Sequence, residues 1–180
     1  GDSLPLREDS PLRPVSPYAA SKVAAEHYCS AFFRSYGLGT VILRYFNVYG
    51  PGQGHNPYGG VISRFLSNAL NGEPLVVFGD GEQSRDFIYL DDVVEASMSA
   101  LENQSSVGEV FNVCTGRCIT VNELVKTLKD ITGSVIETKY CEGRKGDVRV
   151  SYGDSVKAKE FLGFKAKTCL RDGLEKSVPA

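Results

Sequence analysis

The pattern of hydrophobic and polar positions predicts helices that alternate with short strands along most of the chain. Ser16 followed by Pro17 favours the start of a helix. We expect this helix to continue to about Tyr36 and to end at Gly37. The nearly continuous β-favouring run over residues 40–45 is typical of a buried parallel strand. Strands that alternate with helices in this way indicate an α/β fold.

The later elements follow from caps, glycines and β-favouring runs. Residues 47–60 are rich in Gly and Pro and are expected to form an irregular loop. We expect further helices over residues 61–71, 91–103, 121–132, 155–162 and 170–177, and strands over residues 75–78, 85–90, 110–113 and 135–140. Thr120 and Glu123 have the spacing of a capping box, and Asp91 with Asp92 is expected to cap the helix that they open.

Two helices have faces that predict how they pack. Small apolar residues cover much of the first helix and suit close packing against a sheet: Ala19, Ala20, Ala24, Ala25 and Ala31. The expected apolar face of the helix over residues 91–103 consists of Val93, Ala96, Ala100 and Leu101.

Composition and charge exclude several classes of protein. The chain has 180 residues, of which 42% are hydrophobic and 23% charged, so it is not disordered, collagen-like or a disulfide-rich miniprotein. A formal net charge of −2 argues against a nucleic-acid partner. No apolar run approaches the ~20 residues of a membrane helix, so we expect no membrane partner. The five cysteines are scattered, which predicts no metal site and, as free thiols, a cytoplasmic protein.

Tyr18 and Lys22 are candidates for acid–base chemistry. They are four residues apart on the first helix, so their side chains share one face. An ammonium group close to a phenol favours the phenolate, which is a usable general base. Chance readily supplies this spacing in a chain with nine tyrosines, and Lys22 with Glu26 could equally form a solvated helix pair.

Three arginines lie at or beside expected junctions of loops and strands: Arg44, Arg85 and Arg144. Guanidinium groups suit phosphate oxygens, and a diphosphate favours more than one of them, although any one could be an ordinary surface arginine. Phe46 and Asn47 follow the expected buried strand, where open α/β sheets bind ligands. Asn47 could equally be a turn residue.

Four motifs, taken in order, resemble one family: residues 16–22 (SPYAASK), 44–51 (RYFNVYGP), 78–92 (FGDGEQSRDFIYLDD) and 144–147 (RKGD). Together they resemble the extended short-chain dehydrogenase/reductases that act on nucleotide sugars, and most closely the UDP-glucose (UDP-galactose) 4-epimerase group. The resemblance covers essentially the whole chain, and the joint occurrence of the motifs at family spacing makes it specific.

The resemblance implies an NAD-dependent isomerase with roles for individual residues. Tyr18 would take the proton of the sugar 4-hydroxyl while hydride passes from C4 to NAD. Lys22 would hold the nicotinamide ribose and favour the tyrosine phenolate, and the backbone of Phe46 would face the cofactor. The remaining residues would bind a UDP-hexose: Asn47 and the backbone near Val61 the diphosphate, Val76 and Phe78 the base, Arg85 and Arg144 the phosphates, and Asp147 a ribose hydroxyl.

The sequence also departs from the family pattern. The family begins with a Rossmann βαβ unit that carries Gly-x-x-Gly-x-x-Gly, and no such motif occurs here. The family's catalytic Ser or Thr lies in a segment just before a Tyr-Gly. Gly1 resembles the glycine of that pair, so we expect the catalytic Ser or Thr to be missing from this chain. The expected fold is therefore the carboxyl-terminal part of a Rossmann-type doubly wound parallel sheet plus a smaller α/β substrate-binding lobe. We expect the isolated chain to bind NAD weakly and to catalyse no turnover.

The expected division has two parts. Residues 1–58 would be the remainder of the NAD-binding domain, including the helix with Tyr18 and Lys22. Residues 59–180 would be mainly the nucleotide-sugar-binding lobe, with residues 85–113 returning to the Rossmann domain. The intact protein is expected to be a homodimer. A nucleotide-sugar 4,6-dehydratase or decarboxylase, or a non-catalytic nucleotide-sugar-binding fragment, remains as an alternative.

Overall fold

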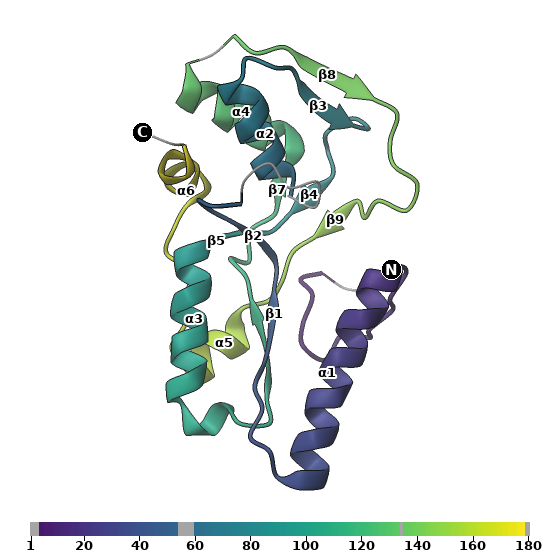
Figure 1. Ribbon diagram of the computed structural model, residues 1–180, viewed down its shortest axis with the longest axis vertical. Coiled ribbons are helices and arrows are strands. Elements are labelled where there is room, and N and C mark those ends of the chain that lie inside the picture. Colours follow the sequence, from purple (N-terminus) through teal and green to yellow (C-terminus); the bar gives the residue numbers. More distant parts are fainter. Residues whose placement is uncertain (1–3, 54–59, 134, 179–180) are drawn as a thin grey trace.

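The computed structural model describes residues 4–53, 60–133 and 135–178 and has a mixed α/β fold (Figure 1). Three of its sheets are parallel pairs: β1 (Ile42–Tyr45) with β6 (Val110–Val113), β2 (Asn47–Tyr49) with β5 (Phe87–Tyr89), and β3 (Leu75–Phe78) with β8 (Thr138–Cys141). In a further sheet, β4 (Ser84–Arg85) lies between antiparallel β7 (Ile119–Thr120) and parallel β9 (Val150–Ser151).

The helices are α1 (Pro17–Tyr36), α2 (Val61–Leu70), α3 (Leu90–Glu102), the short 3₁₀ helix η1 (Gln104–Ser106), α4 (Val121–Thr132), α5 (Val156–Leu162) and α6 (Leu170–Ser177). Helix ends with strong local signals are confirmed. The Ser16 hydroxyl accepts from the N–H of Ala19 at 3.1 Å, and Gly37 ends α1 in the left-handed conformation with φ of 67°. Both bonds of the expected capping box at Thr120 and Glu123 are present.

Two hydrophobic cores hold these elements together. One core, in the upper half of Figure 1, contains Phe65 of α2 and Leu124 of α4. The other joins α3 and α5 to β6. Strand β5 contributes to both, because its alternate side chains point to opposite faces: Phe87 and Tyr89 enter the first core and Ile88 the second. The segment around β4 and β5 is therefore fixed at the junction of the two cores.

The expected loop over residues 47–60 is wrong at its start. Asn47, Val48 and Tyr49 form β2, which pairs in register with residues 87–89. The partner strand lies 40 positions further along the chain, so local composition does not reveal the pairing. Residues 54–59 of this loop, and Gly1, lie outside the described ranges.

Two expectations for α3 are also wrong. Tyr89 precedes the helix, and no side chain caps it. Asp92 is instead buried, and its carboxylate accepts from the backbone N–H groups of Lys167 and Thr168, each at 3.1 Å. Leu101 is 75% exposed, so the apolar face consists of Val93, Ala96 and Ala100. A carboxylate in a first helical turn accepts whichever N–H groups the fold brings to it, and here these come from residues 75 and 76 positions away.

The strand expected over residues 135–140 begins only at Thr138, and Val135 is fully exposed. The alanine face of α1 differs more. No described residue of α1 is buried, and the helix lies apart from α3 and α5, on the other side of β1 (Figure 1). Its links to neighbouring segments include the Arg44–Glu26 ion pair with β1 and the close approach of the Phe33 ring to Gly108. Within the described ranges, none of the helices combines the length and the hydrophobicity that a transmembrane span requires.

Candidate functional site

One cavity of about 190 Å³ is lined by all seven residues to which the family resemblance gave a role in substrate binding. We call it the arginine pocket. It is lined by Asn47, Val61, Arg64, Phe65, Val76, Val77, Phe78, Gln83, Arg85, Val121, Arg144 and Asp147. These residues come from β2, α2, β3, β4, α4, the loop between β3 and β4, and the loop between β8 and β9. The fold therefore brings together segments that are up to 100 positions apart in the sequence.

The arginine pocket carries a net positive charge. Among the described residues, its lining holds three guanidinium groups and a single carboxylate, that of Asp147. The carboxylate is paired with Arg85, with Nη2 of the arginine 2.5 Å from its oxygen. The guanidinium of Arg144 lies over the ring of Phe78, 4.0 Å from its centroid. Because arginines stay protonated, the lining has an excess charge of +2, which favours an anionic ligand.

The sequence analysis missed Arg64. This residue lies on α2, three positions after Val61, so the two side chains share one helix face. Its Nε atom is buried and has no hydrogen-bond partner among the described residues. Burial lowers the pKa of the Arg64 guanidinium, and the charge of Arg144 lowers it further. The sequence offered one signal for Arg64, its spacing of three positions from Val61. That spacing becomes informative only once α2 is known to border the pocket.

The junction of the two cores fixes Asn47 and Arg85. The carbonyl oxygen of Asp86 accepts both the backbone N–H and the side-chain Nδ2 of Asn47, each at 3.0 Å. The Asp86 carboxylate is fully buried. It accepts from N–H and Oγ1 of Thr115 at 2.9 and 2.7 Å and from the N–H of Gly116 at 2.9 Å. Asp86 thus ties two pocket residues, its chain neighbour Arg85 and its hydrogen-bond partner Asn47, to the loop after β6.

A second cavity, of about 520 Å³, adjoins the arginine pocket at Asn47, which lines both. We call it the tyrosine cavity. Tyr18 and Phe46 line it, and the Tyr18 side chain is 72% exposed. Lys22 lies beside Tyr18, with its Nζ atom 5.5 Å from the centroid of the ring, but it is not among the lining residues. The phenol therefore faces open space rather than packed hydrocarbon.

Arg44, unlike Arg85 and Arg144, is outside the arginine pocket. Its guanidinium donates to both carboxylate oxygens of Glu26, at 2.5 and 2.9 Å, and to the carbonyl of Glu8 at 2.9 Å. Arg44 thus joins α1 to the amino-terminal loop and to β1. The ordinary alternative for Lys22 was a solvated pair with Glu26 on the same helix. Glu26 instead pairs with Arg44.

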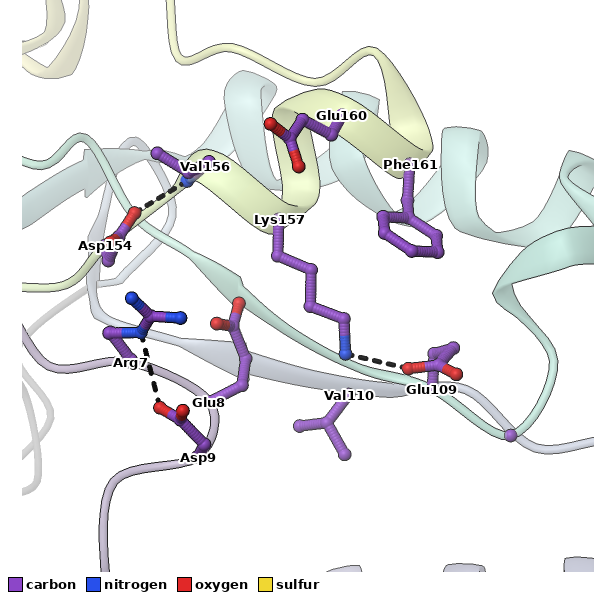
Figure 2. Close-up of a pocket in the computed structure, with 11 residues that line it drawn as sticks. Arg7, Glu8, Asp9, Glu109, Val110, Asp154, Val156, Lys157, Glu160 and Phe161 are labelled. Atoms are coloured by element: carbon purple, nitrogen blue, oxygen red, sulfur yellow. Dashed lines mark hydrogen bonds and ion pairs between the residues drawn. The ribbon is translucent and has the colours of Figure 1, made fainter.

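Figure 2 shows another cavity, of about 480 Å³, between the amino-terminal loop, β6 and α5. It contains none of the residues that the sequence singled out for substrate or cofactor binding. Carboxylates dominate its lining: Glu8, Asp9, Glu109, Asp154 and Glu160, against the cations Arg7 and Lys157. Lys157 is already paired with Glu109 at 2.7 Å. This lining disfavours anions, in contrast to the arginine pocket.

Comparison with known proteins agrees with these features. Residues 1–114 match the NAD dependent epimerase/dehydratase family. The UDP-glucose 4-epimerase of Mycolicibacterium smegmatis is 37% identical over 176 residues, which are 98% of this chain and 56% of that protein.

Two solved structures are also similar. The UDP-glucose 4-epimerase of Thermotoga maritima with UDP-glucose is 48% identical, with a TM-score of 0.91 over 97% of this chain and 56% of that one. The UDP-N-acetylglucosamine 4-epimerase of Methanobrevibacter ruminantium, in complex with UDP-N-acetylmuramic acid, is 41% identical, with a TM-score of 0.92 and the same coverage. The chain thus spans about half the length of the relatives it matches. It belongs to the NAD dependent epimerase/dehydratase family.

Proposed function

We propose that this chain binds the nucleotide diphosphate of a UDP-hexose and takes part in NAD-dependent epimerisation at C4 of the sugar. The observation that carries the proposal is the excess of guanidinium groups in the arginine pocket, next to a cavity that exposes a phenol. A sugar nucleotide has the matching order of parts, with a diphosphate between the nucleoside and the sugar. The similar epimerases support the choice of substrate class.

The arginine pocket would hold the nucleotide half of the substrate. Arg85 and Arg144 offer planar donor forks that suit phosphate oxygens. Asn47 borders both cavities, so it would contact the diphosphate at the point where the bound substrate passes from one cavity to the other. Val61 is the first residue of α2. Its N-cap residue, Gly60, has no side chain that could accept from the N–H groups of the first turn, so these groups suit an anion.

The remaining lining residues would bind the nucleoside. Val76 and Phe78 present apolar surface on alternate positions of the wall formed by β3, and this surface would flank the base. Asp147 would accept from a ribose hydroxyl with the oxygen that does not contact Arg85.

The tyrosine cavity would hold the sugar and the reactive end of the cofactor. The Tyr18 hydroxyl would take the proton of the sugar 4-hydroxyl, and the Lys22 ammonium beside its ring would hold the nicotinamide ribose. A phenol, an ammonium and the backbone of Phe46 beside about 520 Å³ of open space fit a nicotinamide riboside. NAD, when bound, supplies the acceptor for the hydride of C4. Firm binding of the diphosphate leaves the 4-keto sugar free to turn and present its other face.

The alternative is a nucleotide-sugar dehydratase or decarboxylase, which would use the same diphosphate pocket. Incubating the protein that contains this chain with UDP-glucose and NAD separates an epimerase, which yields UDP-galactose, from a dehydratase, which eliminates water. Release of CO₂ from a nucleotide sugar that carries a carboxylate would identify a decarboxylase. By resemblance to the family, we also propose that the protein is a cytoplasmic homodimer. Light scattering coupled to size exclusion tests the dimer.

Arg144 gives the direct test of the arginine pocket. Replacing Arg144 with methionine is expected to weaken UDP binding about 10- to 100-fold, because a charge-assisted contact is worth about 1.5–3 kcal/mol. Isothermal titration of the 180-residue chain with UDP measures this. Arg117→Met, on an exposed arginine outside the pocket, serves as control and should leave the affinity unchanged. Failure of the unsubstituted chain to bind UDP would contradict the proposed function.

A further inference from the structure

We propose that Arg64 is a third guanidinium ligand of the substrate diphosphate, placed in the pocket at a cost to the stability of the unliganded chain. This inference rests on the proposed function and deepens it, because it adds a binding residue that the family motifs do not contain. The four motifs cover residues 16–22, 44–51, 78–92 and 144–147, and Arg64 lies in none of them.

The first argument is the state of the Arg64 side chain. It lines the arginine pocket, and its Nε atom is buried without a hydrogen-bond partner among the described residues. No described carboxylate forms an ion pair with it. A buried donor on a charged group that lacks a partner is unfavourable. An acceptor that enters the pocket would remove this penalty.

The second argument is the charge around it. Asp147, the only carboxylate among the described residues of the lining, pairs with Arg85, and no other described carboxylate of the lining balances the charges of Arg64 and Arg144. The positive charge of Arg144 acts on Arg64 and opposes its protonated form. Two like charges beside one cavity are stabilised together by a dianion. A sugar-nucleotide diphosphate is such a dianion, since each of its two phosphoryl groups carries a negative charge.

The third argument is the support of the side chain. Arg64 is one turn inside α2, and its neighbours Ile62, Phe65 and Leu66 are buried in the upper core. The helix is therefore firmly anchored and holds the guanidinium at a fixed wall of the pocket. This placement suits a ligand-binding residue, because the backbone that carries Arg64 is already in place before a ligand enters the pocket.

The expected signature is a separation of stability from affinity. Arg64→Met keeps the apolar stem and removes the charge, so the melting temperature of the unliganded chain should stay the same or rise. UDP affinity should fall about tenfold or more, as for the loss of a charge-assisted contact. Arg64→Lys keeps the charge without the planar fork and should recover part of the affinity. An arginine with a purely structural role would instead lower the melting temperature when replaced.

The experiment combines titration calorimetry with UDP and thermal melts of each variant of the 180-residue chain. Arg171→Met, on the exposed face of α6, is the matched control, and it should leave UDP affinity unchanged. If the unsubstituted chain binds UDP and Arg144→Met weakens it while Arg64→Met does not, the role of Arg64 is wrong and the proposed function stands. A melting temperature lowered by Arg64→Met, with unchanged affinity in the folded chain, likewise overturns it. If the unsubstituted chain does not bind UDP, both proposals fail.

Discussion

Replacing Asp86 with alanine is expected to lower the free energy of unfolding by about 3–5 kcal/mol, because several buried donors lose their acceptor together. The Asp86 side chain is fully buried, and its carboxylate accepts from the N–H groups of Thr115 and Gly116 and from the Thr115 hydroxyl. Each buried donor left without a partner costs about 1–3 kcal/mol. Such a loss is a large fraction of the about 5–15 kcal/mol that stabilises an ordinary domain.

Urea denaturation followed by circular dichroism measures this effect. Asp86→Asn should lower the free energy of unfolding by less than Asp86→Ala, because the amide oxygen can still accept a hydrogen bond. It should still be destabilising, because its NH₂ group would face other donors. Asp91→Ala, on an exposed carboxylate of the first turn of α3, is the matched control and should cost less than about 1 kcal/mol. An unchanged denaturation midpoint for Asp86→Ala would show that the buried carboxylate does not hold the junction of the two cores.

The consequence of Asp86 reaches the proposed site through the backbone. Its carbonyl accepts from the backbone N–H and the side-chain amide of Asn47, and the preceding residue, Arg85, lines the arginine pocket. A variant that loosens this junction should therefore bind UDP less well even where it remains folded. A buried carboxylate on a residue that lines neither cavity thus connects the stability of the fold to the geometry of the pocket.

Sequence patterns predicted the elements whose signals are local. Ser16 and Gly37 mark the two ends of α1 because an N-cap hydroxyl and a left-handed glycine act within one helical turn. The capping box at Thr120 and Glu123 is local for the same reason. Strand β2 was missed because it pairs with residues 87–89, which are far away in the sequence, and local composition carries no signal of that pairing. Two glycines and a proline directly after it made the segment resemble a loop.

The candidate site divides in the same way. Arg85, Arg144 and Asp147 could be singled out because they stand in motifs that resemble a family. Arg64 could not, since an arginine on an amphipathic helix is ordinarily a surface residue. The proposed role of Arg64 follows only from the fold, in which α2, β3 and the loop with Arg144 line one cavity. The alanine face of α1 illustrates the reverse case, because composition predicted packing that the described residues do not supply.

Replacing Tyr18 with phenylalanine is expected to lower kcat for the interconversion of UDP-glucose and UDP-galactose by about 10²- to 10⁴-fold, the usual contribution of a positioned acid–base group. The substitution removes only the hydroxyl of a side chain that is 72% exposed, so it should leave the melting temperature unchanged. UDP affinity should also persist, because Tyr18 lines the tyrosine cavity and not the arginine pocket. The expected loss is therefore in kcat rather than KM.

The measurement uses the protein that contains this chain, with NAD present and product followed by chromatography. Tyr36→Phe is the matched control, because Tyr36 is 79% exposed on the same helix and lines neither cavity. Lys22→Met should lower kcat in the same direction as Tyr18→Phe, since its ammonium lies beside the phenol. If Tyr18→Phe keeps the kcat of the unsubstituted protein while Arg144→Met still weakens UDP binding, the diphosphate pocket is correct and the proton acceptor lies elsewhere. The assignments of the diphosphate pocket and of the proton acceptor can therefore fail separately, because they rest on different elements and different cavities.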